Sequence, residues 1–161
     1  MILEAELLQG LAKLPVEKRA ITNLRTLNEA YHYAKPSSFS RGMRIDLNGL
    51  AILLISGTAS IDENGQSVHI GDFRAQLRRT FQNITLLVEA EGATWKDIVR
   101  TTCYLRDIER DYEAFNEERT AFYKEQGLDP LPASTGIQAI LCRPELLIEI
   151  EAIAMFRTEK K

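Results

Sequence analysis

One long amphipathic helix is the sequence feature that most constrains how this chain can fold. Gly71 and Asp72 precede a segment whose apolar residues recur every three or four positions, and Asp72 is a suitable N-cap. The recurring residues are Phe73, Leu77, Phe81, Ile84 and Val88. A helix of this kind has to bury its apolar stripe against a second layer of structure. The rest of the chain must therefore supply that layer.

The chain has strand patterns on both sides of this helix, and these strands can form the second layer. Residues 43–47 alternate apolar and polar, Asn48-Gly49 is a tight hairpin signal, and residues 50–56 are a short apolar run. The further predicted elements are a short strand over 67–70, strands over 97–107, 133–142 and 146–156, and a second amphipathic helix over 110–126. The order β-β-β-α-β-α-β-β predicts an α+β fold, a mixed sheet with two main helices on one face.

We make a separate prediction for the first 35 residues. Leu7, Leu8, Leu11 and Leu14 give a helical stripe, and a second helical stretch is expected over 24–31. We therefore predict an N-terminal helical extension over 1–35, which packs on the domain or on a neighbouring subunit. The main domain covers 36–157, and 158–161 form a polar tail.

Composition limits the function classes. The net charge is −3 and the pI about 5.5, which disfavours nucleic acid as a partner. Cys103 and Cys142 lie in apolar segments, so both are expected to be buried, reduced thiols. His32 and His69 are not at ligand spacing, so no metal is expected. No glycine loop suggests a cofactor phosphate, and no span or signal peptide is visible, so we expect no cofactor, no membrane contact and a cytoplasmic location.

Several segments, in their order, resemble the YjgF/RidA family. They are Ser56-Gly57, Gly71-Asp72, the helix with Gln76, Asn83 and Ile84, then 97–107, 112–116, 132–133 and 148–154. The resemblance covers residues 36–157. It implies the chorismate-mutase-like (YjgF-like) fold and a homotrimer whose sheets form a barrel-like centre, with ligand clefts at the subunit interfaces. It also implies hydrolysis of enamines and imines to 2-keto acids and ammonia.

The family's substrate clamp is missing from this sequence. The resemblance implies an arginine that binds the substrate carboxylate, and a glutamate that positions water. Ser134 stands where the arginine would be, Gly136 where a cysteine would be, and Glu149, thirteen residues later, where the glutamate would be. Each charge-assisted hydrogen bond contributes roughly 1.5–3 kcal/mol. Turnover of ordinary 2-imino acids is therefore doubtful unless another cation replaces the arginine.

Glu149 is the predicted catalytic residue. It alternates with core positions on the last strand and shares a face with Glu151, where partial burial would raise its pKa. Arg41 is the candidate substitute cation, although a solvated loop arginine is the alternative, and Asn116 is expected to brace the cleft. The predicted substrate-binding residues are Phe39, Arg41, Ser56, Gly57, Thr58, Asn116, Ser134, Thr135 and Gly136.

Three function classes stay open from the sequence. The first is a small-molecule enzyme that uses Glu149 and a water to hydrolyse or tautomerise an imine, enamine or enol ether; a chorismate-processing variant is suggested by residues 56–60. The second is a non-catalytic metabolite-binding or chaperone-like homotrimer. The third, an endoribonuclease or translation inhibitor, is disfavoured by the net charge.

Overall fold

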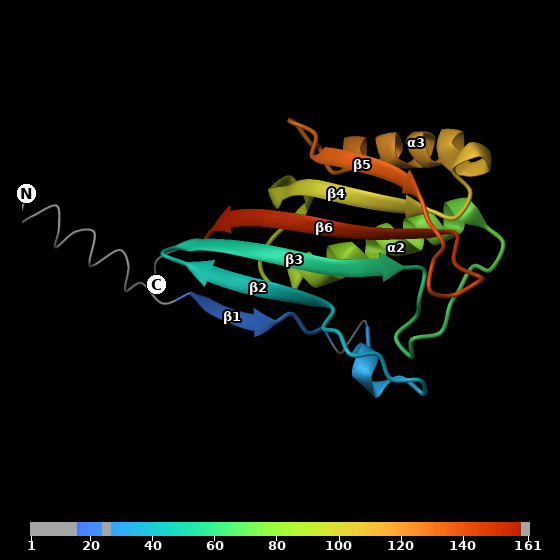
Figure 1. Ribbon diagram of the computed structural model, residues 1–161. Helices are drawn as coiled ribbons and strands as arrows, with labels where there is room; N and C mark the ends of the chain where they lie inside the picture. The colour runs from blue at the N-terminus through green and yellow to red at the C-terminus, as the bar shows by residue number, and fades with distance from the viewer. Residues whose placement is uncertain (1–15, 24–26, 159–161) are drawn as a thin grey trace, which may run out of the picture.

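A computed structural model describes residues 16–23 and 27–158, and it has the predicted α+β architecture. Six strands form one sheet in the order β1-β2-β3-β6-β4-β5, and helices α2 and α3 both lie behind it in Figure 1. The strands are β1 Glu17–Ala20, β2 Gly42–Leu47, β3 Leu50–Ala59, β4 Ile98–Leu105, β5 Ala133–Gln138 and β6 Ile148–Arg157. The helices are α2 Phe73–Glu89 and α3 Ile108–Glu125, with short 3-10 turns at η1 Ala30–His32 and η2 Trp95–Asp97.

The sheet is antiparallel except at one edge. β3 pairs with β2 and β6, β6 pairs with β4, and each of these pairs is antiparallel. Only β4 and β5 run parallel, because α3 carries the chain back between them. The β2–β3 hairpin turns at Asn48 and Gly49, which both have positive φ, as the tight turn requires.

Helix α2 confirms the predicted cap and stripe. The Asp72 carboxylate accepts a hydrogen bond from the Ala75 amide at 2.9 Å. All five stripe residues are buried, from Phe73 to Val88. They pack in one core with the inward side chains of the sheet, including Leu53 and Ile150. The periodicity therefore places α2 directly on the sheet.

The predicted helical extension is wrong in its described part. Residues 17–20 form strand β1, which pairs antiparallel with β2. Residues 27–29 are not helical, and only η1 forms a short turn; the Leu7–Leu14 stripe and residues 24–26 lie outside the described residues. Ile21 and Leu27 are fully buried in the main core. Burial of these two side chains favours docking of the segment as an edge of the sheet.

Two smaller predictions also need correction. Ser67 makes only an isolated bridge to Ile61, because the positive φ of His69 and Gly71 turns the chain into α2 before a strand forms. β5 ends at Gln138 rather than at residue 142, so Cys142 lies in the following loop and is exposed, whereas Cys103 is buried. Among the described residues, no helix is long and apolar enough to cross a membrane.

Candidate functional site

Glu149 lies on the face of the sheet that the helices leave uncovered. Its neighbours Ile148 and Ile150 are fully buried on the helix side, so the alternation of β6 turns Glu149 and Glu151 to the other side. Glu149 is itself only partly exposed. The predicted division of β6 into a core face and an acidic face is therefore confirmed.

A bulge in β3 makes room for the Glu149 carboxylate. The register between β3 and β6 shifts between Ile55 and Thr58, and Gly57 lies inside this irregularity. A Cβ atom placed on Gly57 would lie 2.1 Å from Oε1 of Glu149. The carboxylate therefore rests on the bare backbone of Gly57, an approach that any larger residue would block.

The surroundings of Glu149 favour its protonated form. Burial raises the pKa of its carboxyl group, and the negative charge of Glu151 raises it further. The exposed Cys142 thiol lies 4.0 Å from Oε2. Glu149 forms no ion pair with any residue in 16–23 or 27–158. A carboxylate in this setting can both accept a proton and return it.

A small cavity of about 80 Å³ opens beside this carboxylate. Glu149 and Gly57 line one part of it, and Phe39 and Arg41 line another. The volume is enough for water molecules. A wider groove of about 580 Å³ adjoins the cavity, and the two share Tyr33, Ser37, Cys142 and Arg143.

Arg41 lines the cavity, but two of its N–H groups are already hydrogen-bonded to the backbone. Its side chain is 4% exposed, and Nε and Nη2 both donate to the Asn28 carbonyl, at 3.1 and 2.9 Å. The guanidinium lies 4.9 Å from the Tyr33 ring centre and 5.5 Å from that of Phe39. Burial lowers the pKa of Arg41, and nearby Glu29 opposes this shift. Arg41 therefore brings positive charge to the cavity wall, while the edge of its guanidinium formed by Nε and Nη2 is held by the Asn28 carbonyl.

Tyr33, Cys142 and Arg143 are among the cavity residues that sequence reasoning missed. Nη1 of Arg143 donates to the Gly65 carbonyl at 2.7 Å and to the Ser67 hydroxyl at 3.2 Å. Its guanidinium lies 5.7 Å from the Tyr33 ring centre. The sequence shows Arg143 only as part of a turn, and Tyr33 only as part of the N-terminal arm. Neither position carries a local signal of a site.

Ser56 and Thr58 flank Gly57 but support the backbone rather than line the cavity. The Ser56 hydroxyl donates to the Ser40 carbonyl at 2.7 Å. Thr58 is buried, and its hydroxyl donates to the Ser56 carbonyl at 2.8 Å. The Ser56 bond ties the loop with Phe39 and Arg41 to β3, whereas the Thr58 bond stays within β3.

The remaining predicted residues form a second group, at β5 and α3. Ser134, Thr135 and Gly136 lie on β5, an edge strand whose six residues are all exposed. Asn116 on α3 accepts a hydrogen bond from Arg119, and Arg119 also donates to Ser134. Within one chain, the structure therefore separates this group from the cavity at Glu149.

No group of three or more His, Cys, Asp or Glu side chains that could hold a metal occurs in the described part of the chain. The site consists of a carboxylate, aromatic rings and arginines. Such a site can bind and protonate a small polar molecule.

Comparison with known proteins decides the family. A family model described as Endoribonuclease L-PSP matches residues 34–156. The chain belongs to this family. The fold also agrees: the YjgF gene product of E. coli superposes with a TM-score of 0.68 at 28% identity, over 86% of this chain and 99% of that one.

Other members of the L-PSP family confirm the YjgF/RidA resemblance. The 3-aminoacrylate deaminase RutC of Acinetobacter baylyi is 34% identical over 103 residues, which are 64% of this chain and 78% of that protein. A RutC family protein of Haemophilus influenzae is 32% identical over 69% of this chain and 82% of its own length. The Rid family protein YyfA of Yersinia pestis has a TM-score of 0.68 at 27% identity, over 86% of this chain and 98% of that one.

Proposed function

We propose that this protein hydrolyses the C=N bond of a small imine, or of the imine tautomer of an enamine, with Glu149 as the residue that activates water. The observation that carries the proposal is the partly buried carboxylate of Glu149, which faces a water-sized cavity and has a raised pKa. The relative from Acinetobacter baylyi is named a 3-aminoacrylate deaminase, which is chemistry of the same class.

The proton balance of the reaction suits a carboxylate in this position. Glu149 takes a proton from water as the water oxygen bonds to the imine carbon and the C=N electron pair moves to nitrogen. Glu149 then returns the proton to that nitrogen, which gives a neutral carbinolamine. In the second half of the reaction Glu149 takes the hydroxyl proton and passes it to the amine nitrogen, so the C–N bond breaks, ammonia leaves and a carbonyl remains. A pKa raised toward neutrality serves both transfers, since the group must accept and release the proton in one turnover.

Arg41 has a supporting part in this proposal. Two of its donors are held by the Asn28 carbonyl, so it is a poor candidate for a two-point clamp. Its charge lies beside the same cavity as Glu149 and attracts an acid group on the substrate. Phe39 covers the guanidinium and forms part of the cavity wall.

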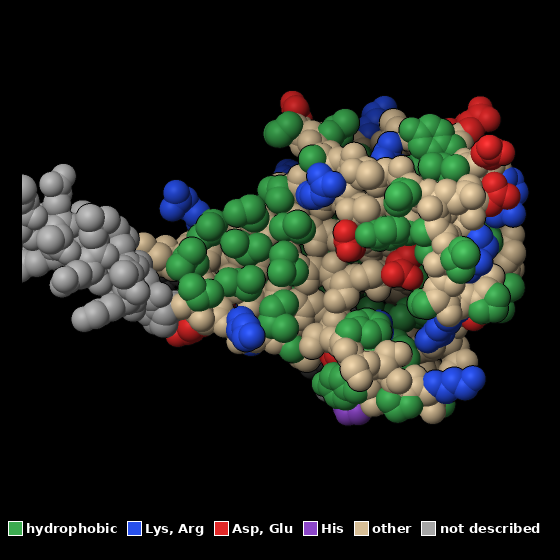
Figure 2. Space-filling model, viewed as in Figure 1, with side chains coloured by type: hydrophobic (Ala, Val, Ile, Leu, Met, Phe, Trp, Pro, Cys, Tyr) green, Lys and Arg blue, Asp and Glu red, His purple; other side chains and the backbone are tan. Residues whose placement is uncertain are grey.

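The separation of the two residue groups supports a site shared between chains. We propose a homotrimer in which β5 and α3 of one subunit meet the Glu149 cavity of the next. The uncovered sheet face carries Met43, Ile52, Leu54, Ile153 and Met155, which pair across β2, β3 and β6. Figure 2 shows a broad hydrophobic area over these strands. An exposed apolar patch of this kind is typical of a subunit interface.

Ribonuclease activity, which the family description names, receives less support. The net charge is −3, and RNA binding depends on neutralising many phosphates. Digestion of RNA at physiological salt, if it followed the pure protein through purification, would favour that reading instead.

The test is ammonia release from freshly generated imines, with one substrate that carries a carboxylate, such as 2-iminobutyrate, and one that does not. We expect turnover by the wild type and by Glu125→Gln, an exposed control on α3, and strong loss in Glu149→Gln. Equal activity of Glu149→Gln would overturn the assigned role. Ligand binding without turnover of any imine would favour the metabolite-binding trimer.

A further inference from the structure

The groove beside the Glu149 cavity is large enough to hold a part of the substrate that the cavity cannot. The cavity has a volume of about 80 Å³ and the groove one of about 580 Å³, and small-molecule sites span roughly 300–1,000 Å³. The two are continuous, since both are lined by Tyr33, Ser37, Cys142 and Arg143. Beyond these residues the groove extends to Lys35 and Pro144. A molecule whose C=N bond lies at Glu149 can therefore place its far end in the groove.

Positive charge gathers where the cavity meets the groove. The guanidinium carbons of Arg41 and Arg143 lie 4.9 and 5.7 Å from the centre of the same Tyr33 ring. Burial lowers the pKa of Arg41, Glu29 opposes this shift, and the charge of Arg143 adds to it. Lys35 brings a third cation. Within residues 16–23 and 27–158, no carboxylate lies within 4.0 Å of any of these three cations. An anion bound here would relieve the repulsion between them.

One edge of the Arg143 guanidinium is free to bind a ligand. Nη1 donates to the Gly65 carbonyl at 2.7 Å and to the Ser67 hydroxyl at 3.2 Å, which fixes the side chain against the turn at Gly65. Nε and Nη2 form the other edge, and they donate to none of the residues that the structure describes. Two parallel N–H groups on one edge suit two oxygens of an oxyanion.

The charge balance of the groove favours a phosphate over a carboxylate. Glu145 also lines the groove, where its carboxylate accepts a hydrogen bond from the Ser67 hydroxyl at 2.7 Å. This bond lowers the pKa of Glu145, so the group is ionised and offsets one of the two cations of the groove, Lys35 and Arg143. A phosphate monoester has a charge of about −1.5 to −2 at neutral pH. It therefore gains more from the remaining positive charge, and from Arg41 beside it, than a singly charged carboxylate.

We propose that this groove binds a phosphate group at the far end of the substrate, with Arg143 as the two-point donor and Lys35 as the second cation. This inference rests on the proposed function and narrows its substrate class to imines of phosphorylated carbonyl compounds. Tyr33 and Pro144 provide apolar surface for the chain between the two ends. Tyr33 precedes residue 34, where the match to the family model begins, so this wall of the groove comes from the N-terminal segment.

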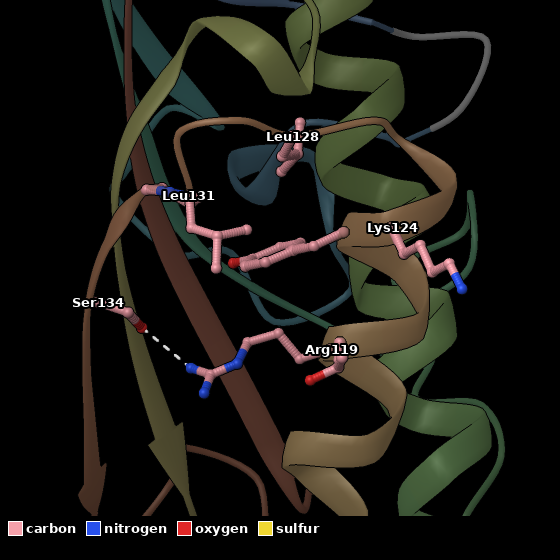
Figure 3. Close-up of a pocket in the computed structure, with 8 residues that line it drawn as sticks. Arg119, Lys124, Leu128, Leu131 and Ser134 are labelled. Carbon is pink, nitrogen blue, oxygen red and sulfur yellow. Dashed lines mark hydrogen bonds between the residues drawn. The ribbon is translucent and has the colours of Figure 1, made fainter.

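The test is binding of dihydroxyacetone phosphate, a ketone that carries a phosphate, by NMR titration, which requires no catalysis. Arg143→Gln should weaken binding at least tenfold, since one charge-assisted hydrogen bond contributes a factor of about ten to a hundred. Lys35→Gln should weaken it about two- to fivefold, because Lys35 is exposed. The matched control is Lys124→Gln, which should bind like the wild type. Lys124 is an exposed lysine on α3, beside a separate cavity, and Figure 3 shows its side chain pointing away from β5.

Two uncharged or differently charged ketones identify the group that is bound. Dihydroxyacetone, which lacks the phosphate, should bind weakly and equally to all four proteins. Levulinate, which carries a distal carboxylate, should bind more weakly than dihydroxyacetone phosphate, and equal or tighter binding of levulinate would overturn the assignment to phosphate. Equal affinity of the wild type and both groove variants for dihydroxyacetone phosphate would overturn the inference, as would absence of binding to the wild type.

Further measurements separate this inference from the proposed hydrolysis. Thermal melting checks that each variant is folded, and the exposed Lys35→Gln substitution continues the test if Arg143→Gln does not fold. Glu149→Gln should retain the wild-type affinity for dihydroxyacetone phosphate. Binding that depends on Arg143, in a protein that releases no ammonia from any imine, would contradict the hydrolysis and leave the phosphate site standing. Turnover of imines by a protein that does not bind the phosphate would do the reverse.

Discussion

Glu149 combines two features at the scale of a single residue, namely partial burial and a like-charged neighbour. Both raise the pKa of its carboxyl group. Gly57 keeps the space that the carboxylate occupies, and Cys142 lies on its other side. The nearby arginines, Arg41 and Arg143, are held by carbonyl groups. Glu149 is therefore placed to titrate closer to neutral pH than an ordinary glutamate.

The pH profile of ammonia release tests this arrangement. Since Glu149 must be ionised to accept a proton from water, kcat/KM should rise with pH through its raised pKa. Glu151→Gln removes the like charge, which lowers that pKa, and so the acidic limb should move to lower pH. A limb that stays in place, or moves to higher pH, would contradict the proposed coupling between the two carboxylates.

Strand β1 shows at the scale of an element how residues that precede the matched family model contribute to the fold. The family model begins at residue 34, but β1 continues the sheet and Ile21 and Leu27 enter the core. Arg19 and Arg44 both pair with Glu91 after α2, which ties the strand to the helix layer. The N-terminal segment is therefore a structural part of this domain.

Truncation of Ile21 measures how much the segment that contains β1 contributes to the stability of the domain. Ile21→Ala should lower the free energy of unfolding by about 2–4 kcal/mol, because the side chain is fully buried and leaves a cavity. Val16→Ala, at an exposed position next to β1, should change it by less than about 0.5 kcal/mol. Denaturant unfolding of both variants provides the values, and a loss below about 1 kcal/mol for Ile21→Ala would show that the segment is not part of the core.

Local patterns in the sequence were enough to predict those elements whose formation depends on residues close together in the chain. The Asp72 cap, the stripe of α2 and the alternation around Glu149 each depend on neighbouring residues, and all three are confirmed. The pairing of β1 with β2 and the contact of Arg119 with Ser134 depend on long-range packing, which no local period encodes. The prediction that Cys142 is buried was wrong for a related reason. Its apolar neighbours continue past the end of β5 into a loop, where the thiol is exposed.

The whole molecule presents an uncovered sheet face and an exposed edge strand at β5. A layer of apolar side chains on one face of a sheet is stabilised when another layer covers it. An edge strand with free backbone groups can likewise be protected by a neighbouring chain. Both features agree with the proposed trimer, in which the Glu149 cavity of one subunit meets β5 of another.

Light scattering tests the assembly. The wild type should have the mass of three 18.2 kDa chains, and Leu54→Asp should reduce that mass by placing a charge in the apolar patch. Ile70→Asp, at an exposed turn away from the patch, should keep the trimer. A wild-type protein with the mass of one chain would contradict the shared cleft.

The most direct test of the central claim is the ratio of kcat for ammonia release between wild type and Glu149→Gln, measured on one freshly generated imine at one pH. The substitution keeps the size of the side chain but cannot accept a proton. General-base catalysis contributes about 10²–10⁴-fold, so the account predicts a kcat reduced at least a hundredfold with the thermal melting temperature retained. A folded Glu149→Gln variant with a kcat within a few fold of the wild type would contradict it.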